Sequence, residues 1–184
     1  MPELIAPDPR VQVSFLEAHT EIGNDAGHGW SDADRWLGLM SGREPVQRVE
    51  SLLRPETFAA FCADQRLLAE EDAPRPDGYV ADTVLWWVDG NQWLGRLSVR
   101  HRLTRSLRDI GGHIGYVVRP SARRRGHATA MLVAALPVAR GLGIDQALVT
   151  CDHDNLPSRR VIEKAGGVLE DRRGVKLRYW VPTR

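Results

Sequence analysis

The residues that point most directly to chemistry lie between positions 118 and 129. Val118-x-Pro120 has the character of a strand end, and the run Arg123-Arg124-Arg125-Gly126-His127-Ala128 leads from it into a helical pattern. A helix that begins in this way presents unpaired backbone N–H groups and the positive end of its dipole. Gly126 lacks a Cβ atom, so the backbone there can approach an anion closely. The segment therefore predicts a site for a phosphate or pyrophosphate group.

Other phosphate-binding loops fit this sequence less well. It contains no G-x-x-x-x-G-K-S/T motif, and no G-x-G-x-x-G motif follows a strand. The alternative without a ligand is a solvated basic helix start, which is common where R-R-R-G stands alone. The placement directly after a strand favours the anion site.

Length and composition are those of one soluble domain, with 184 residues, 42% apolar and 27% charged. The sequence shows neither a transmembrane stretch nor a signal peptide, so we expect a cytoplasmic protein with no membrane partner. Cys62 and Cys151 are expected to be reduced thiols, and two cysteines so far apart do not suggest a metal site.

The net charge of +1 conceals two halves of opposite sign. Residues 1–95 contain 7 Arg and 17 Asp or Glu, a balance of −10, whereas residues 96–184 contain 18 Arg or Lys and 7 Asp or Glu, a balance of +11. This division suggests that the second half binds an anion and that the first half attracts a cation. The alternative is that acidic and basic surfaces pair with each other across the fold.

The first half reads as helices followed by a hairpin. Helices are predicted near residues 10–20, 31–40 and 55–71, and the glycine-rich residues 23–29 predict a flexible loop. The β-branched and aromatic residues 83–88, the turn Asp89-Gly90-Asn91 and residues 92–100 predict a β-hairpin.

The second half alternates between strand and helix patterns. Strands are predicted at residues 112–118 and 147–151, with a helix at 124–140 that Pro137 should kink. Asn155 should cap a short helix that Gly166-Gly167 ends, and strands follow at 168–171 and 175–181. This order predicts an α/β domain built on a mixed sheet.

Three features together resemble the GNAT superfamily of N-acetyltransferases. Arg123-x-x-Gly126-x-Ala128 is similar to the family's acetyl-CoA motif, and Asn155-x-x-Ser158 with Lys164-Ala165-Gly166-Gly167 is similar to its N-x-x-A and K-x-G-F segments. The strand order from Thr83 onward is also similar, so the resemblance covers roughly residues 80–181. The G-G-H-I-G-Y segment at 111–116 resembles a bacterial subgroup of the family.

The resemblance implies an architecture. It implies one GNAT domain over residues 1–184, with a helical acceptor-side region at 1–80 and an acetyl-CoA-binding core at 81–184. The sheet would be mostly antiparallel, flanked by helices, and splayed between its fourth and fifth strands, here residues 112–118 and 147–151.

The resemblance also implies acetyl-CoA as co-substrate and assigns residues to it. Backbone groups of Tyr116, Val117 and Val118 would pair with the pantetheine arm as an added strand does. The pyrophosphate would be held by the loop and first helical turn, that is by Arg123, Arg124, Arg125, Gly126, His127, Ala128 and Thr129. Asn155, with Ser158 in the same motif, would meet the end of the pantetheine.

The family's usual catalytic acid and base have no counterpart here. The Tyr that often follows the motif Asn by seven residues is Ile162, and the usual Glu position is Gly112. His113 is a candidate base, with a core histidine as the alternative because strand neighbours face opposite sides. Tyr179 is the candidate substitute acid. Water linked to carboxylates of the acidic first half is a further candidate base.

Residues 151–154 offer two other chemistries that we do not predict. Cys151 lacks a His and acid at diagnostic spacing, so a core cysteine is favoured over a nucleophile. Asp152, His153 and Asp154 are adjacent on one loop, which rarely closes a metal site alone. We therefore predict no metal.

The predicted function is transfer of an acetyl group from acetyl-CoA to a primary amine of a small molecule or peptide, by direct attack in a ternary complex. The first alternative is a non-catalytic module that binds or senses acyl-CoA. The second is nucleic-acid binding through the basic residues 100–108, against which the acidic first half argues. We expect no nucleic-acid partner and leave a homodimer open. Acceptor specificity should lie in the first 80 residues and in the loop 102–111.

Overall fold

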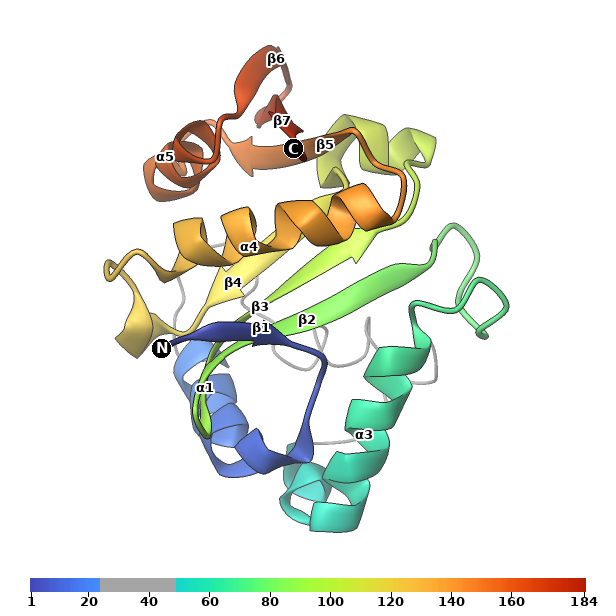
Figure 1. Cartoon of the computed structure of the whole chain (residues 1–184), viewed down its shortest axis with the longest axis vertical. Coiled ribbons are helices and arrows are strands. Elements are labelled where there is room, and N and C mark those ends of the chain that lie inside the picture. The colour runs from blue at the N-terminus through green and yellow to red at the C-terminus, as the bar shows by residue number, and fades with distance from the viewer. Residues whose placement is uncertain (24–48) are drawn as a thin grey trace.

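A mostly antiparallel sheet organises the chain, of which the computed structural model describes residues 1–23 and 49–184 (Figure 1). Within these residues the sheet has seven strands in the order β1-β2-β3-β4-β5-β7-β6. They are β1 (Glu3–Ile5), β2 (Asp82–Asp89), β3 (Gln92–Arg100), β4 (Ile114–Val118), β5 (Gln146–Asp152), β6 (Val168–Arg173) and β7 (Lys176–Pro182). Neighbouring strands are antiparallel except β4 and β5, which run parallel.

Helices lie on both faces of this sheet. On one face are α1 (Gln12–Gly23), after the turn η1 (Pro9–Val11), and α3 (Pro55–Leu67), after η2 (Val49–Leu53). On the other face is α4 (His127–Gly141), as Figure 1 shows. The remaining elements are the π-helical turn η3 (Leu107–Gly111), the turn η4 (Pro120–Ala122) and α5 (Leu156–Lys164).

Strand β2 shows why the sheet is covered on both faces. Val84, Trp86 and Val88 are buried among the residues of α1 and α3, and Trp86 stacks on Phe15 with ring centroids 5.1 Å apart. Trp87, which points the opposite way, belongs to the cluster around α4. Alternate side chains of one strand therefore reach two cores.

Most of the predicted elements are confirmed. The hairpin turns at Gly90, whose φ of 58° needs the conformational freedom of glycine. The Asn155 side chain caps α5 by accepting a hydrogen bond from the Ser158 amide, and Pro157 sits in the first turn. The mixed sheet of the α/β prediction is confirmed, with β4 and β5 as its parallel pair.

The structure differs from the predicted elements at several positions. β1 was missed, and η3 forms within residues 102–111, which we predicted as a loop. The helix predicted at 55–71 ends at Leu67. The predicted helix at 31–40 and positions 24–29 of the predicted loop lie outside the described residues, while Gly23 ends α1.

Helix α4 continues through Pro137 to Gly141. Pro137 cannot donate to the Val133 carbonyl, and both residues lie on the exposed side of the helix. A carbonyl on that side can accept a hydrogen bond from water. The proline is therefore tolerated where a buried one would break the helix.

Candidate active site

Strands β4 and β5 part soon after they meet. The two strands share one register position in the described structure, Ile114 with Val149, whereas β4 stays paired with β3 as far as Val118 with Gly95. The edge of β4 from Gly115 to Val118 therefore faces β5 without a ladder. Backbone groups on such an edge can pair with an extended ligand. This parting lies between the two strands where the family resemblance implied a splay.

Gly112 and His113 fasten β4 to β5 where the parting begins. The His113 amide donates to the Leu148 carbonyl at 2.7 Å, and the Leu148 amide donates to His113 Nδ1 at 2.9 Å. Gly112 has a φ of 69°, and a Cβ atom there would lie 2.5 Å from the Leu148 carbonyl oxygen. A side chain at position 112, such as the family's usual Glu, would therefore clash with the backbone of β5.

His113 has the environment of a structural histidine. Its side chain is 8% exposed, and burial, with Arg108 and Arg100 nearby, lowers its pKa to about 4. The ring is therefore neutral near pH 7 and Nδ1 is already an acceptor for Leu148. The candidate role of His113 as base gains no support from this geometry and stays a prediction.

The backbone at the start of α4 has features that suit an anion-binding loop. Gly126, the residue before the helix, has a φ of 85°, and no side chain caps the helix. A Cβ atom at Gly126 would meet nothing within 4 Å, so space lies open beside it. Arg124 also adopts a positive φ, 62°, which costs a non-glycine residue about 1–2 kcal/mol. Alternating backbone conformations of this kind gather N–H groups into an anion-binding concavity.

Side chains of this loop divide between the protein and the solvent. Arg123 Nε donates to the Val118 carbonyl at 3.2 Å, and His127 Nδ1 accepts from Trp87 Nε1 at 3.2 Å. His127 can therefore serve a ligand through its backbone amide rather than its ring. Arg124 and Arg125 are exposed at the loop surface.

Glu21 on α1 anchors the segment that joins β4 to this loop. Its carboxylate pairs with the buried Arg119 and accepts a hydrogen bond from the Ser121 amide at 3.0 Å. Partial burial raises the pKa of Glu21, but the hydrogen bonds from Arg119 and Ser121 outweigh it and lower the pKa to about 2. Acidic and basic halves of the sequence thus pair across the fold at this point.

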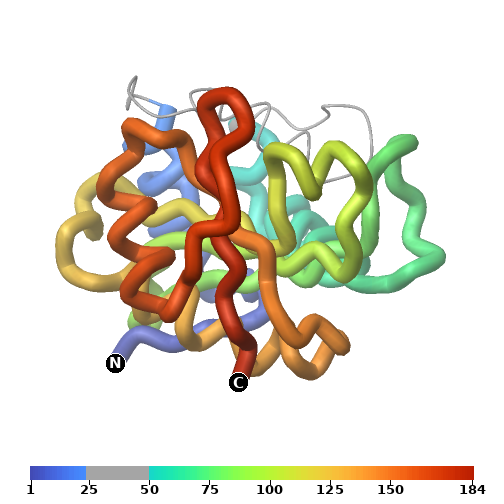
Figure 2. The backbone as a smooth tube through the Cα atoms, turned by 90° about the horizontal axis from the view of Figure 1, so that it is seen from above, coloured from blue at the N-terminus to red at the C-terminus, as the bar shows by residue number. Residues whose placement is uncertain are grey.

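A pocket of about 190 Å³ opens at the other end of the parting. Its wall includes Gly115 and Tyr116 of β4, Cys151 and Asp152 of β5, and Asn155 and Ser158 of α5. Further wall residues come from β3, η3 and β7. Figure 2 shows the β6–β7 hairpin between α5 on one side and the η3 segment on the other. The pocket therefore lies where six elements of the second half of the chain converge.

Three of the predicted cofactor residues meet in this pocket. The side-chain oxygen of Asn155 accepts a hydrogen bond from the Ser158 amide at 3.1 Å, which leaves the Asn155 NH₂ group as a donor. The hydroxyls of Ser158 and Tyr116 lie 2.8 Å apart. Burial raises the pKa of Tyr116, so its hydroxyl stays protonated through the neutral range.

Tyr179, the candidate acid, lies elsewhere. It is 1% exposed, is absent from the pocket wall, and donates to Glu163 of α5 at 3.2 Å. Burial raises its pKa. Ile162, at the family's usual Tyr position, is also fully buried in the core. The hydroxyl of Tyr116 therefore lines the pocket and that of Tyr179 does not, while the role of Tyr179 as acid stays a prediction.

Three charged residues of the pocket wall were not predicted from the sequence to belong to this site, namely Arg100, Asp152 and Lys176. Asp152 was considered only as a metal ligand. Asp152 and Lys176 form an ion pair at 2.8 Å. Among the described residues of the wall, Asp152 is the carboxylate, and it comes from the second half of the chain. The predicted carboxylate from the acidic first half is therefore not found in that wall. Cys151 also lines the pocket, and burial raises its pKa to about 11, which keeps the thiol neutral.

Within 1–23 and 49–184, no three His, Cys, Asp or Glu side chains are grouped to hold a metal ion. Over the same residues, no helix combines the length and apolar character needed to cross a membrane.

The parted parallel strands, the uncapped helix start and the antiparallel remainder of the sheet form the architecture that the resemblance to the GNAT superfamily implied. Residues 28–168 match the family model described as the Acetyltransferase (GNAT) domain. The chain therefore belongs to the GNAT acetyltransferase family, as the sequence resemblance implied. No curated protein matches the chain by sequence.

Solved structures of acetyltransferases share the fold. The PaiA N-acetyltransferase of Thermoplasma acidophilum, in complex with coenzyme A, superposes with a TM-score of 0.59 at 12% identity over 99% of both chains. Mycobacterium smegmatis RimJ, in complex with CoA-disulfide, gives 0.60 at 17% identity over 98% of this chain and 81% of that one. A Salmonella typhimurium acetyltransferase that modifies the N-terminal serine of ribosomal protein L7/L12 gives 0.55 at 18% identity over 98% and 94%.

Proposed function

We propose that the protein is an acetyl-CoA-dependent N-acetyltransferase that acetylates a primary amine of a small molecule or peptide by direct attack in a ternary complex. One observation carries the proposal: the open edge of β4 runs from the uncapped start of α4 to the pocket beside Tyr116. Along that edge, four residues of strand span about 13 Å. A pyrophosphate at one end and a thioester at the other would use both sites together.

Each part of the cleft has a role in this proposal. Amides from Arg124 to Thr129, with the exposed arginines beside them, hold the pyrophosphate. Backbone groups of Gly115 to Val118 pair with the amides of the pantetheine arm, and the Asn155 NH₂ group donates at its end. Acetyl-CoA supplies the activated acyl group.

Tyr116 takes the position of hydrogen-bond donor to the departing thiol in this proposal. Its protonated hydroxyl and the Ser158 hydroxyl line the pocket as a connected pair. A thiol has an ordinary pKa near 8.5, so the thiolate is a modest base and needs little more than a hydrogen bond.

Removing the proton of the amine is the harder step. A lysine-like amine has an ordinary pKa near 10.4, so about one molecule in 2,500 is neutral at pH 7. Position 112 cannot carry a Glu and His113 is committed to Leu148. Water therefore receives the proton, and kcat/KM should rise with pH toward 9. A bell-shaped profile centred near 7 would show instead that a dedicated residue accepts it.

The test separates this enzyme from a module that only binds or senses acyl-CoA. Calorimetric titration with CoA and acetyl-CoA measures binding, and thiol release with a panel of primary amines measures transfer. Saturable binding with amine-dependent thiol release is the expected result. Binding without thiol release across the panel would favour the sensing module, for which the absence of a Glu at Gly112 and of a Tyr at Ile162 is the supporting observation.

A further inference from the structure

Arg100 is held rigidly at the pocket, with part of its guanidinium unused. It ends β3, and its Nη1 donates to the carbonyls of Gly111 and Gly112, both at 3.1 Å. Among the described residues, no group accepts a hydrogen bond from its Nε or Nη2. The side chain is half-buried and lines the pocket. A Cβ atom built on Gly115 would lie 3.5 Å from Nη2, so the guanidinium rests on β4 where that strand parts from β5.

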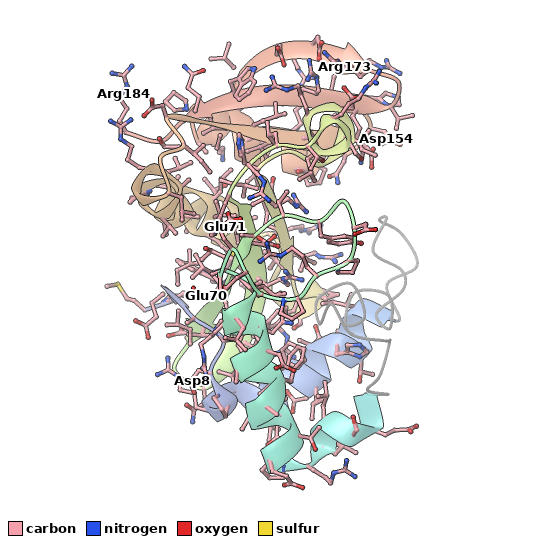
Figure 3. The ribbon with its side chains drawn as sticks, turned by 90° about the vertical axis from the view of Figure 1, so that its right-hand side faces the viewer. Asp8, Glu70, Glu71, Asp154, Arg173 and Arg184 are labelled. Atoms are coloured by element: carbon pink, nitrogen blue, oxygen red, sulfur yellow. The ribbon has the colours of Figure 1, made fainter. Side chains whose placement is uncertain are left out.

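The charge of Arg100 is not cancelled within the pocket wall. The wall holds two cations, Arg100 and Lys176, and one carboxylate, Asp152, which Lys176 already pairs at 2.8 Å. Asp82 on the adjacent strand interacts with Arg100 electrostatically. No ion pair joins Asp82 and Arg100 in the described part of the chain, and Asp82 is not part of the wall. Figure 3 shows Asp154 and Arg173 near the same end of the molecule, and neither residue lines the pocket.

The location separates this cation from the cofactor's phosphates. Arg100 lies against the start of β4, whereas the anion-binding loop follows the end of the same strand. Three or four strand residues, about 10–13 Å, lie between the two. An anion at Arg100 would therefore belong to the other substrate.

We propose that Arg100 recognises an anionic group on the acceptor, so that the acceptor is an amine that also carries a carboxylate or a phosphate. This proposal rests on the proposed function and specifies its substrate class. A guanidinium fixed by two carbonyls presents its remaining N–H groups in a planar array that suits a carboxylate or phosphate. The same positive charge disfavours diamines and other polycations in the pocket.

The experiment compares amines that differ only in the anionic group. One pair is 5-aminopentanoate and pentylamine, with ω-amino acids of two to six carbons to cover the spacing, and 1,5-diaminopentane as the cationic counterpart. The other pair is 2-aminoethyl phosphate and ethanolamine, so the two pairs separate a carboxylate from a phosphate. Thiol release gives kcat/KM for each amine, and calorimetry gives the binding of the two anionic probes to the CoA-saturated protein.

Three variants test the residue. Arg100→Gln removes the charge, and Arg100→Lys keeps the charge without the planar array. Arg140→Gln is the matched control, because Arg140 is exposed, pairs with Asp145, and lies outside both the pocket wall and residues 102–111. Circular dichroism and the thermal midpoint show whether each variant is folded. If Arg100→Gln does not fold, the comparison of Arg100→Lys with the wild type is the test.

We expect the wild type to prefer the anionic member of one pair at least tenfold. Loss of a hydrogen bond to a charged group should reduce that preference about 10- to 100-fold in Arg100→Gln and by a smaller factor in Arg100→Lys. Arg140→Gln should keep the preference. An equal loss for the anionic and neutral amines, or an unchanged preference, would overturn the proposal.

The two readouts separate this proposal from the proposed function. Arg100-dependent binding of an anionic probe without turnover would support the anion site and refute catalysis. Turnover of neutral and anionic amines at equal rates would support catalysis and overturn the anion site. Probes that neither bind nor react would also overturn it.

Discussion

Gly126 offers the sharpest test of the anion site, because its replacement can separate charge from shape. In Gly126→Asp the new carboxylate would occupy open space beside the helix start, since a Cβ atom there meets nothing within 4 Å. Gly126→Asn adds a side chain of the same size without the charge. Both residues tolerate a positive φ better than other side chains do. The difference between the two variants therefore reports the charge alone.

The structure sets the size of each effect. A φ of 85° should destabilise both variants by about 1–2 kcal/mol, a fall of a few degrees in Tm for a chain of this length. Two like charges about 4 Å apart repel by about 1 kcal/mol in water and about 4 kcal/mol at an effective dielectric constant of 20. We therefore expect the Kd for CoA to be at least tenfold weaker in Gly126→Asp than in Gly126→Asn.

Calorimetric titration with CoA, and thermal unfolding of the free proteins, measure the two effects separately. Equal Kd values in the Asp and Asn variants would place the pyrophosphate away from Gly126 and refute the assignment of this loop. A much larger fall in Tm for Asp than for Asn would mean that the carboxylate disturbs the fold, and the binding difference would then lose its meaning.

Three further outcomes are expected. In turnover assays Tyr116→Phe should lower kcat by more than tenfold and Tyr179→Phe by less than tenfold; the reverse order would show that Tyr179 is the acid. The folded protein keeps His113 neutral down to about pH 4, whereas His113 of the unfolded chain becomes protonated near pH 6.5. The free energy of unfolding should therefore fall by up to about 3 kcal/mol as the pH drops between these values. Urea titrations should show a shallower fall in His113→Gln, and identical slopes of stability against pH would contradict the assignment. Glu21→Gln removes the nearer carboxylate of buried Arg119 and should cost about 2 kcal/mol in the same urea assay at pH 7, while an unchanged midpoint would show that the pair adds nothing to stability.

The parts of the fold that local chemistry dictates could be predicted from the sequence. Asp89-Gly90-Asn91 specifies a hairpin, Asn155 with Pro157 specifies the start of a helix, and Gly126 precedes the start of α4. These signals work because each needs only a few neighbouring residues. β1 escaped because three residues, Glu3–Ile5, are too few to show a period of two.

The missing parts of the candidate site depend on contacts between distant residues. Arg100 stood out only as one member of a basic run, and its position comes from the carbonyls of Gly111 and Gly112. Tyr179 was chosen for its residue type, but its side chain turns to Glu163. Tyr116 was assigned through its backbone, whereas its hydroxyl reaches α5. Strand alternation shows that a side chain changes face, and it does not show which face holds the cleft.

The brief meeting of β4 and β5 divides the sheet into two blocks, one of β1 to β4 and the other of β5, β7 and β6. Across the described junction, one register position joins their ladders, and beside it His113 bonds to Leu148 through both its amide and its ring. Each block can therefore exchange its amide hydrogens through its own local opening. A ligand that pairs with both edges of the parting would join the two blocks into one cooperative unit. Occupancy of the cleft should therefore slow the exchange of amide hydrogens in β5 and β7, which lie beyond the open edge of β4.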